Sequence, residues 1–179
     1  LKISKNFKEK IYVNKFSFLV PEVKKLTPFS ILKKKYNIPN FFFYLPNQFW
    51  THKNHFIVLK ALSFLREKGI NLVVVASGYS QDYRSANYFA SIKEYIKVNN
   101  IEKNFKYIGV IPNIDVMSLI YNCTGLINPS KFEGWSSTVE QGKSYNKKIL
   151  LSNINTHLEQ KPKKSFFFPP DDYKKLAKI

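Results

Sequence analysis

The sequence alternates between short apolar runs and segments with the periodicity of an α-helix. The apolar runs are FFFYL (41–45), LVVV (72–75), YIGVI (107–111), GLI (125–127), ILL (149–151) and FFF (166–168). Each run is continuous and rich in aromatic or branched residues, which is typical of strands whose two faces are both buried. The pattern therefore predicts a parallel sheet of about six strands.

The segments between these runs carry apolar residues at helical spacing. Three such stripes are Val58, Ala61, Leu62 and Leu65; Tyr88, Ile92, Tyr95 and Ile96; and Val116, Leu119 and Ile120. Strands that alternate with helices predict a parallel sheet covered by helices on both faces, joined by right-handed crossovers. The expected fold class is α/β, a Rossmann-like doubly wound parallel sheet.

Residues 1–40 do not follow this alternation. KIYVNKF (10–16) could form a strand, PEVKKLTP (21–28) has a proline at each end, and SILKKKYN (30–37) is at most a short helix before Pro39. We interpret 1–40 as the tail of a preceding domain followed by a basic interdomain linker, and 41–179 as the Rossmann-like domain. Because the first residue is leucine and no signal-like pattern follows, we expect a fragment of a longer protein.

The net charge of +17 is typical of proteins that bind nucleic acids or anionic membranes. Residues 1–40 hold ten lysines and two glutamates, a net charge of +8, so almost half of the excess lies in less than a quarter of the chain. Only Arg66 and Arg84 are arginines, whereas base readout and bidentate phosphate recognition favour arginine. The charge favours an anionic membrane surface, or merely a lysine-rich solvated face, over a nucleic acid.

Two further features bear on the compartment. No run approaches the ~18 consecutive apolar residues of a membrane span, and Cys123 is the only cysteine. A lone cysteine fits a reducing compartment and is more often a buried structural thiol than a nucleophile. We therefore expect a cytoplasmic domain, with peripheral association at the inner face of the membrane as a further hypothesis.

The stretch NPSKFEGWSSTVEQGK (128–143) follows the fourth apolar run and enters a predicted helix. Ser137 or Thr138 can cap that helix, whose free N-H groups and positive dipole end attract a phosphate. Gly134 lets the backbone come close to such an anion. The loop PNQFWTHKNH (46–55) follows the first run and carries Lys53. In open α/β sheets ligands bind at the carboxyl ends of strands, so both loops are expected to meet at one phosphate site.

Structural explanations compete with these assignments. Glu140 lies three residues after Ser137, and Gln141 three after Thr138, so either could complete a capping box. Lys53 by itself would be a solvated lysine, and Trp50 and Trp135 are more often packing residues. The histidines His52, His55 and His157 lack metal-ligand spacing, and no GxGxxG, P-loop or GxSxG motif occurs. By themselves, these patterns predict only an α/β domain with a site for an anion.

The order of these motifs resembles a known family. PNQFWTHKNH, then a helix, LVVVASGYS, and the stretch from YIGVI to NTHLEQ are similar to the C-terminal domain of family 4 retaining glycosyltransferases of the GT-B fold. The resemblance covers about 41–179. It implies a nucleotide-sugar-binding domain, a hexosyltransferase that retains anomeric configuration, and no metal or other cofactor. It also implies a saccharide or lipid-linked acceptor, a role in surface polysaccharide biosynthesis, and an N-terminal domain without which this chain is inactive.

The resemblance also implies roles for individual residues. Glu133 resembles the first glutamate of the family's E-x7-E motif, which contacts the transferred sugar, and is the candidate catalytic residue. Lys53 resembles the lysine that contacts the donor diphosphate. The remaining donor-binding candidates are the helix N-terminus formed by Gly134, Trp135, Ser136 and Ser137, and the nucleobase positions Val110 and Ile111.

The sequence departs from the family pattern at two positions. Gln141 follows Glu133 with seven residues between them, where the pattern has a glutamate that holds ribose hydroxyls; Gln141 itself, or Glu140 one position earlier, could take that part. Gln48 stands where an arginine usually precedes the lysine by five residues. Three function classes follow: a glycosyltransferase donor domain, a catalytically silent nucleotide-sugar-binding module of the same fold, and a basic nucleic-acid-binding domain.

Overall fold

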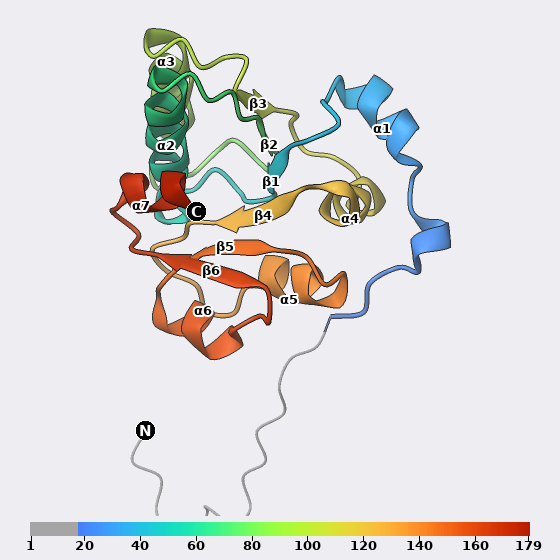
Figure 1. Ribbon diagram of the computed structural model, residues 1–179. Coiled ribbons are helices and arrows are strands. Elements are labelled where there is room, and N and C mark those ends of the chain that lie inside the picture. Colours follow the sequence, from blue (N-terminus) through green and yellow to red (C-terminus); the bar gives the residue numbers. More distant parts are fainter. Residues whose placement is uncertain (1–17) are drawn as a thin grey trace, which may run out of the picture.

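The computed structural model describes residues 18–179, and the strand considered for residues 10–16 lies outside this range. Six strands form one parallel sheet in the order β3-β2-β1-β4-β5-β6 (Figure 1). Their bounds are β1 (Phe43–Leu45), β2 (Val74–Ala76), β3 (Phe105–Tyr107), β4 (Gly125–Asn128), β5 (Ile149–Ser152) and β6 (Ser165–Phe168). The predicted fold class, a doubly wound Rossmann-like sheet of six parallel strands, is confirmed.

Seven α-helices and two 3-10 helices lie in the described range. They are η2 (Val23–Lys25), α1 (Phe29–Tyr36), η3 (Thr51–Lys53), α2 (His55–Glu67), α3 (Tyr88–Val98), α4 (Asn113–Asn122), α5 (Ser137–Ser144), α6 (Asn155–Gln160) and α7 (Tyr173–Lys178). The stripe of Val58, Ala61, Leu62 and Leu65 is buried on α2, as its spacing predicted. Asp172 caps α7 by accepting a hydrogen bond from the backbone N-H of Lys175 at 2.8 Å.

Helices cover both faces of the sheet, and each face has its own hydrophobic core. In Figure 1, α2, α3 and α7 stand together on one side, while α1, α4 and α5 stand on the other. Side chains alternate accordingly along β5: Leu150 belongs to the core under α2, α3 and α7, whereas Ile149 and Leu151 belong to the opposite core. Because both faces are buried, the strands need apolar residues at every position, and this produces the continuous apolar runs in the sequence.

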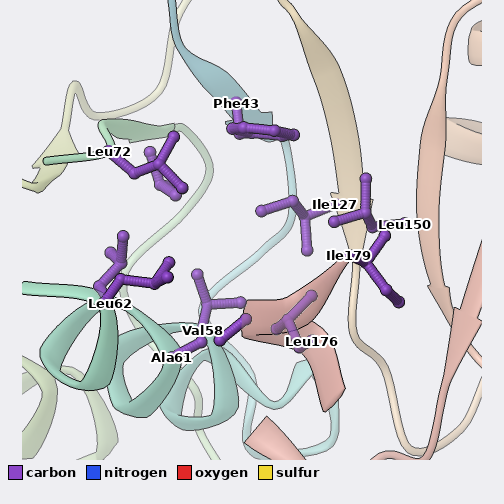
Figure 2. A pocket seen from close by; sticks show the side chains of 12 residues that line it. Phe43, Val58, Ala61, Leu62, Leu72, Ile127, Leu150, Leu176 and Ile179 are labelled. Carbon is purple, nitrogen blue, oxygen red and sulfur yellow. The ribbon is translucent and has the colours of Figure 1, made fainter. Parts of the chain in front are cut away.

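The core under α2 and α7 contains a small cavity of about 60 Å³. Figure 2 shows side chains from α2, α7 and the sheet around it, among them Phe43, Leu62, Ile127 and Leu176. All the residues that line it are apolar. Its side chains offer no partner to a charged ligand, so we interpret it as a packing gap between α2, α7 and the sheet.

The third strand lies earlier than the sequence predicted. YIGVI (107–111) was the expected strand, but β3 is Phe105–Tyr107 and the chain leaves the sheet immediately afterwards. Gly109 has a φ of 80°, in the left-handed region that ends a strand, and Val110 is 69% exposed. The second half of this apolar run is therefore a loop at the carboxyl end of the sheet.

Residues before the first strand pack on the domain. The buried carboxylate of Asp115 in α4 accepts hydrogen bonds from Thr27 Oγ1 at 2.7 Å, Lys35 Nζ at 2.8 Å and Tyr36 OH at 2.6 Å. Leu32 of α1 is completely buried in the core against α4. The assignment of 1–40 to a preceding domain and a linker remains a prediction, but its described part from Thr27 onward is held by the sheet domain.

Cys123 and the apolar character of the helices can be compared with the expectations from the sequence. Cys123 is buried, as predicted for a structural thiol, and burial raises the pKa of this thiol to about 12. Within residues 18–179, none of the helices has the length and apolar character needed to cross a lipid bilayer.

Candidate functional site

The strand order places a topological switch point between β1 and β4. The chain continues from β1 to β2 and β3 on one side, whereas β4 is followed by β5 and β6 on the other. The loops after β1 and β4 therefore meet at the carboxyl edge, where open α/β sheets bind ligands. The structure brings them into contact: the backbone N-H of Lys131 donates to His52 O at 2.8 Å, and Asn47 Nδ2 donates to Asn128 Oδ1 at 3.2 Å.

At this meeting point the two predicted site residues form an ion pair. Lys53 Nζ lies 2.7 Å from Glu133 Oε1 and 2.8 Å from Oε2. The Lys53 side chain is 14% exposed and that of Glu133 is 8% exposed. A bidentate contact between an ammonium group and a carboxylate in so enclosed a place is a strong, charge-assisted interaction. It also leaves both groups near the surface that a ligand would approach.

Local backbone geometry explains the position of Lys53. Lys53 is the last residue of η3, which ends at Asn54 with a φ of 59°. Asparagine tolerates this left-handed conformation better than most residues. The Asn54 side chain donates to Pro129 O at 3.0 Å and to Pro170 O at 2.7 Å, which fastens the turn to the loops after β4 and β6.

Glu133 is held by residues that the sequence analysis did not single out. Ser130 Oγ donates to Glu133 Oε1 at 2.6 Å, and Thr156 Oγ1 donates to the backbone oxygen of Glu133 at 2.7 Å. Ser130 Oγ also lies 2.9 Å from Asn128 Oδ1, the alternative acceptor for its single hydrogen. The only available signal was the Asn-Pro-Ser turn itself, since Thr156 lies in a separate segment after β5.

The N-terminus of α5 differs in detail from the prediction. Ser136, rather than Ser137 or Thr138, is the N-cap, and its Oγ accepts a hydrogen bond from the backbone N-H of Val139. Ser136 has the extended backbone that an N-cap requires, whereas Ser137 is already helical. Asn128 Nδ2 donates to Ser136 Oγ at 2.7 Å, so the cap is also tied to the end of β4.

Neither of the proposed capping boxes forms. The cap is at Ser136, so the third helical position is Val139, which has no polar side chain. Glu140 instead points its carboxylate at Gln160 Nε2, 2.9 Å away, and at Lys143 Nζ, 2.8 Å away. Gln160 also donates to Ser136 O at 2.9 Å. Sequence analysis missed Gln160, whose side chain connects α6 to Ser136 at the cap and to Glu140 in α5.

The other residues at and near the start of α5 differ in their exposure. Gly134 is exposed, and an added Cβ there would meet no heavy atom within 4 Å. Ser137 is exposed, while Gln141 is buried one turn further along the helix. The indole Nε1 of Trp135 is buried without a hydrogen-bond partner among residues 18–179.

Other predicted site residues lie away from the ion pair. Gln48 Oε1 accepts a hydrogen bond from the backbone N-H of Tyr79 at 2.6 Å, so its side chain is engaged with the loop after β2. Val110 and Ile111 lie on the loop after β3, and β3 is separated from β1 by β2. These three residues share the carboxyl edge of the sheet with Lys53 and Glu133 but make no part of their network.

The pKa values of two histidines around the site are lowered, which favours their neutral forms. Burial, followed by the nearby charges of Lys53 and Arg84, lowers the pKa of His52. Burial also lowers the pKa of His157, whose Nδ1 lies 2.9 Å from Ser152 O. Among the described residues no three His, Cys, Asp or Glu side chains gather as a set that could hold a metal ion. The charged side chains next to the α5 N-terminus are those of Lys53, Glu133 and Glu140, and Glu140 is paired with Lys143.

Comparison with solved structures supports this assignment of the fold. A glycosyltransferase from Rickettsia africae matches with a TM-score of 0.73 at 22% identity, over 87% of this chain and 41% of that one. Anabaena HepE in complex with UDP-glucose matches with a TM-score of 0.73 at 17% identity, over 84% of this chain and 41% of that one. This chain thus spans about two fifths of the length of these two proteins.

A third structure is itself a single domain. The C-terminal domain of a group 1 glycosyl transferase family protein (LpcC) from Francisella tularensis matches with a TM-score of 0.69 at 13% identity, over 81% of this chain and 76% of that one. No curated protein matches the chain. The model of the family described as glycosyl transferases group 1 matches residues 29–179. The chain therefore belongs to the group 1 glycosyltransferase family and has the fold of the C-terminal domain of its GT-B members.

Proposed function

We propose that this chain is the donor-binding domain of a retaining, family 4 glycosyltransferase that takes a nucleoside diphosphate sugar. The observation that carries the proposal is the Lys53–Glu133 pair, held beside the N-terminus of α5 at the switch point of the sheet. A diphosphate needs cationic and N-H donors, and a helix N-terminus next to a lysine supplies both. The Anabaena structures, which hold UDP or UDP-glucose, support UDP as a nucleotide to test first.

The chemistry follows from the charges that develop during transfer. Breaking the bond between sugar and phosphate leaves a cationic, oxocarbenium-like sugar and an anionic diphosphate. Lys53 and the backbone N-H groups of Gly134, Trp135 and Ser137 stabilise the departing diphosphate, a preorganised contribution of about 3 kcal/mol for one such donor group. The backbone N-H of Ser136 donates to Gln160 Oε1 instead. Glu133 orients the hydroxyl groups of the sugar and favours its positive charge. In this proposal no metal ion is needed, because the lysine and the helix N-terminus balance the leaving group.

The ion pair prepares the site for this exchange. Without a ligand, Lys53 and Glu133 neutralise each other, so neither buried charge is left unpaired. An incoming diphosphate gives Lys53 a second acceptor, while Ser130 continues to hold Glu133 Oε1. The lysine then bridges the leaving group and the carboxylate, which places Glu133 next to the transferred sugar.

The remaining parts of the proposal come from the family. The acceptor is a saccharide or lipid-linked saccharide in surface polysaccharide biosynthesis, and a separate N-terminal domain of the same protein supplies its binding site. The enzyme is of the hexosyltransferase type, works in the cytoplasm or at the inner face of the membrane, and needs both domains for turnover. Val110 and Ile111 hold the nucleobase, and Gln141 or Glu140 holds the ribose.

Calorimetric titration with UDP, GDP, ADP, CMP and their common sugar conjugates tests the donor site. One nucleoside diphosphate should bind selectively, and Lys53→Ala should weaken it roughly 10- to 100-fold, the effect of one charged hydrogen bond. Lys60→Ala is the matched control, since Lys60 is exposed on α2. Equal loss in both variants, or no selective binding by the chain joined to its N-terminal domain, would refute the proposal.

A catalytically silent nucleotide-sugar-binding module is the second candidate. It is favoured by the two departures from the family pattern, Gln48 and Gln141, which remove a positive and a negative charge from the expected donor site. The two candidates differ in what happens to product formation by the full-length protein when Glu133 is replaced by alanine. Transfer by the wild type that is lost in Glu133→Ala supports the enzyme, whereas donor binding with no transfer in either protein supports the silent module.

A further inference from the structure

A cleft lined by lysines lies at the opposite ends of the strands from the donor loops. The last turn of α5, the turn into β5 and the turn from α6 into β6 surround an open cleft of about 630 Å³. Five lysines line it: Lys143, Lys147, Lys161, Lys163 and Lys164. An asparagine, a glutamine and a proline complete the lining described by the structure, which includes no carboxylate.

The sheet itself brings these lysines together. β5 and β6 are parallel neighbours, with Ile149 opposite Ser165, and Ile149 N-H donates to Lys164 O at 2.9 Å. The dilysine before β5 (Lys147 and Lys148) and the dilysine before β6 (Lys163 and Lys164) are therefore held side by side. Like charges placed in this way repel each other, so an anion bound between them reduces this electrostatic repulsion.

The charges in the cleft are only partly compensated. Lys143 is paired with Glu140, and Lys147 Nζ donates to the backbone oxygen of Tyr121 at 2.9 Å, which supplies no negative charge. Lys161, Lys163 and Lys164 are exposed. Lysine is a flexible point charge with three donors, which suits the varied oxygens of phosphate groups.

We propose that this lysine cleft binds a phosphate-bearing anion. The same chemistry is offered by a soluble polyphosphate and by the head groups of an anionic lipid surface. The inference does not depend on the proposed function, because the cleft is lined by residues that take no part in the Lys53–Glu133 pair. The lysines that line the cleft are not among those of the basic residues 1–40.

The variant that tests the proposal spares the donor site. Lys143 and Gln160 belong to the network that reaches the α5 cap at Ser136, so both are left unchanged. The triple change Lys161→Gln, Lys163→Gln and Lys164→Gln removes three exposed charges from the cleft. The matched control, Lys60→Gln, Lys97→Gln and Lys103→Gln, removes the same charge from exposed positions on α2, on α3 and shortly after it.

Two probes distinguish the sources of the anion. Co-sedimentation at low salt with vesicles of phosphatidylglycerol and phosphatidylcholine, against phosphatidylcholine alone, measures the lipid arm. Each lysine near an anionic surface strengthens binding about fivefold, so the cleft triple should bind roughly 100-fold more weakly and the control only a few-fold more weakly. Calorimetry with tripolyphosphate measures the soluble arm, with Lys53→Ala run alongside to identify binding at the donor site.

Loss of binding to either probe in the cleft triple variant, with binding retained in the control triple variant and in Lys53→Ala, supports the proposal. The probe whose binding is lost identifies the source of the anion. Three results overturn it: no binding of either probe to the wild type, equal weakening in the two triples, or binding lost only in Lys53→Ala. Binding of a short single-stranded DNA that depends on the cleft while both probes fail would also overturn it, in favour of a nucleic acid.

Discussion

Lys53 Nζ lies 2.7 Å from Glu133 Oε1, and this one contact joins the loops that leave the two central strands of the sheet. Both side chains are largely buried, so the pair is part of the stability of the domain as well as of its site. Removing one partner leaves the other charge enclosed without compensation, whereas removing both does not.

A double-mutant cycle measures this relationship. We expect Lys53→Met to lower the free energy of unfolding by about 2 kcal/mol, because it leaves the Glu133 carboxylate with one fewer donor in a buried place. The double variant Lys53→Met, Glu133→Gln should recover part of that loss. Urea denaturation of the four proteins gives the coupling energy, and strictly additive losses would show that the pair is not energetically coupled.

The glycine at the end of β2 should be intolerant of any side chain. Gly78 has a φ of 146°, and an added Cβ would lie 2.4 Å from Asn47 O. Since the obstacle is backbone, it cannot swing aside, and we expect Gly78→Ala to cost about 2 kcal/mol or more and to disturb the neighbouring Gln48 loop. Thermal unfolding measures the loss.

Gly134→Ala is the matched control for that prediction. An added Cβ at Gly134 meets no heavy atom within 4 Å, so the melting temperature should stay within about 2 °C of the wild type. Donor affinity should nevertheless fall, because the methyl group occupies space that the proposed phosphate needs. Equal destabilisation by the two substitutions would contradict the clash argument.

The attachment of α1 should depend on one carboxylate. Asp115 accepts three hydrogen bonds from Thr27, Lys35 and Tyr36. Burial raises the pKa of this carboxyl, but the three hydrogen bonds outweigh burial and hold the pKa below its usual range. We expect Asp115→Ala to lower stability by about 2 kcal/mol and Tyr36→Phe by about 1 kcal/mol, as fewer partners are lost. Hydrogen exchange should show the effect as faster exchange in α1, and unchanged protection there would contradict this role.

Stability should fall as the pH drops from 6.5 towards 4.5. Burial lowers the pKa of His55 to about 3, so the folded protein keeps this ring neutral while the unfolded chain protonates it near pH 6.5. The unfolded state then binds the extra proton, and the free energy of unfolding decreases by up to about 1.4 kcal/mol per pH unit for this one group. Urea denaturation at several pH values in this range measures how steeply the free energy of unfolding falls with pH. This dependence should be shallower for His55→Gln than for the wild type. An unchanged dependence would show that His55 has the same pKa in the folded and unfolded states.

The fold could be predicted because the strands have few other possibilities. Five apolar runs became strands with small shifts in their ends, since a strand covered on both faces has apolar residues throughout. The run at 107–111 misled because apolarity alone cannot tell a strand from an exposed loop, and Gly109 turns the chain out of the sheet after Tyr107. The boundary between strand and loop within this run is set by the pairing of β3 with β2 in the sheet.

The site was predictable in outline for the same reason. Strand order puts the loops carrying Lys53 and Glu133 at one edge, whereas their direct contact depends on the turn at Asn54. Two adjacent serines offered no basis for choosing Ser136 as the cap. Thr156 and Gln160 contribute through long-range hydrogen bonds that have no local pattern, so sequence analysis had no means to find them, whereas Ser130 acts locally within the Asn-Pro-Ser turn.

The strand order has a consequence for the making of the protein. β1 is the first strand of the sheet to leave the ribosome, yet it ends up in the middle, between β2 and β4. One edge of β1 can pair as soon as β2 has been synthesised, but the other must wait for Gly125–Asn128. Throughout that interval the nascent chain presents an unpaired, apolar strand edge, a template for pairing with a second chain. The stretch of translation between β2 and β4 is therefore when a chaperone would protect this protein most.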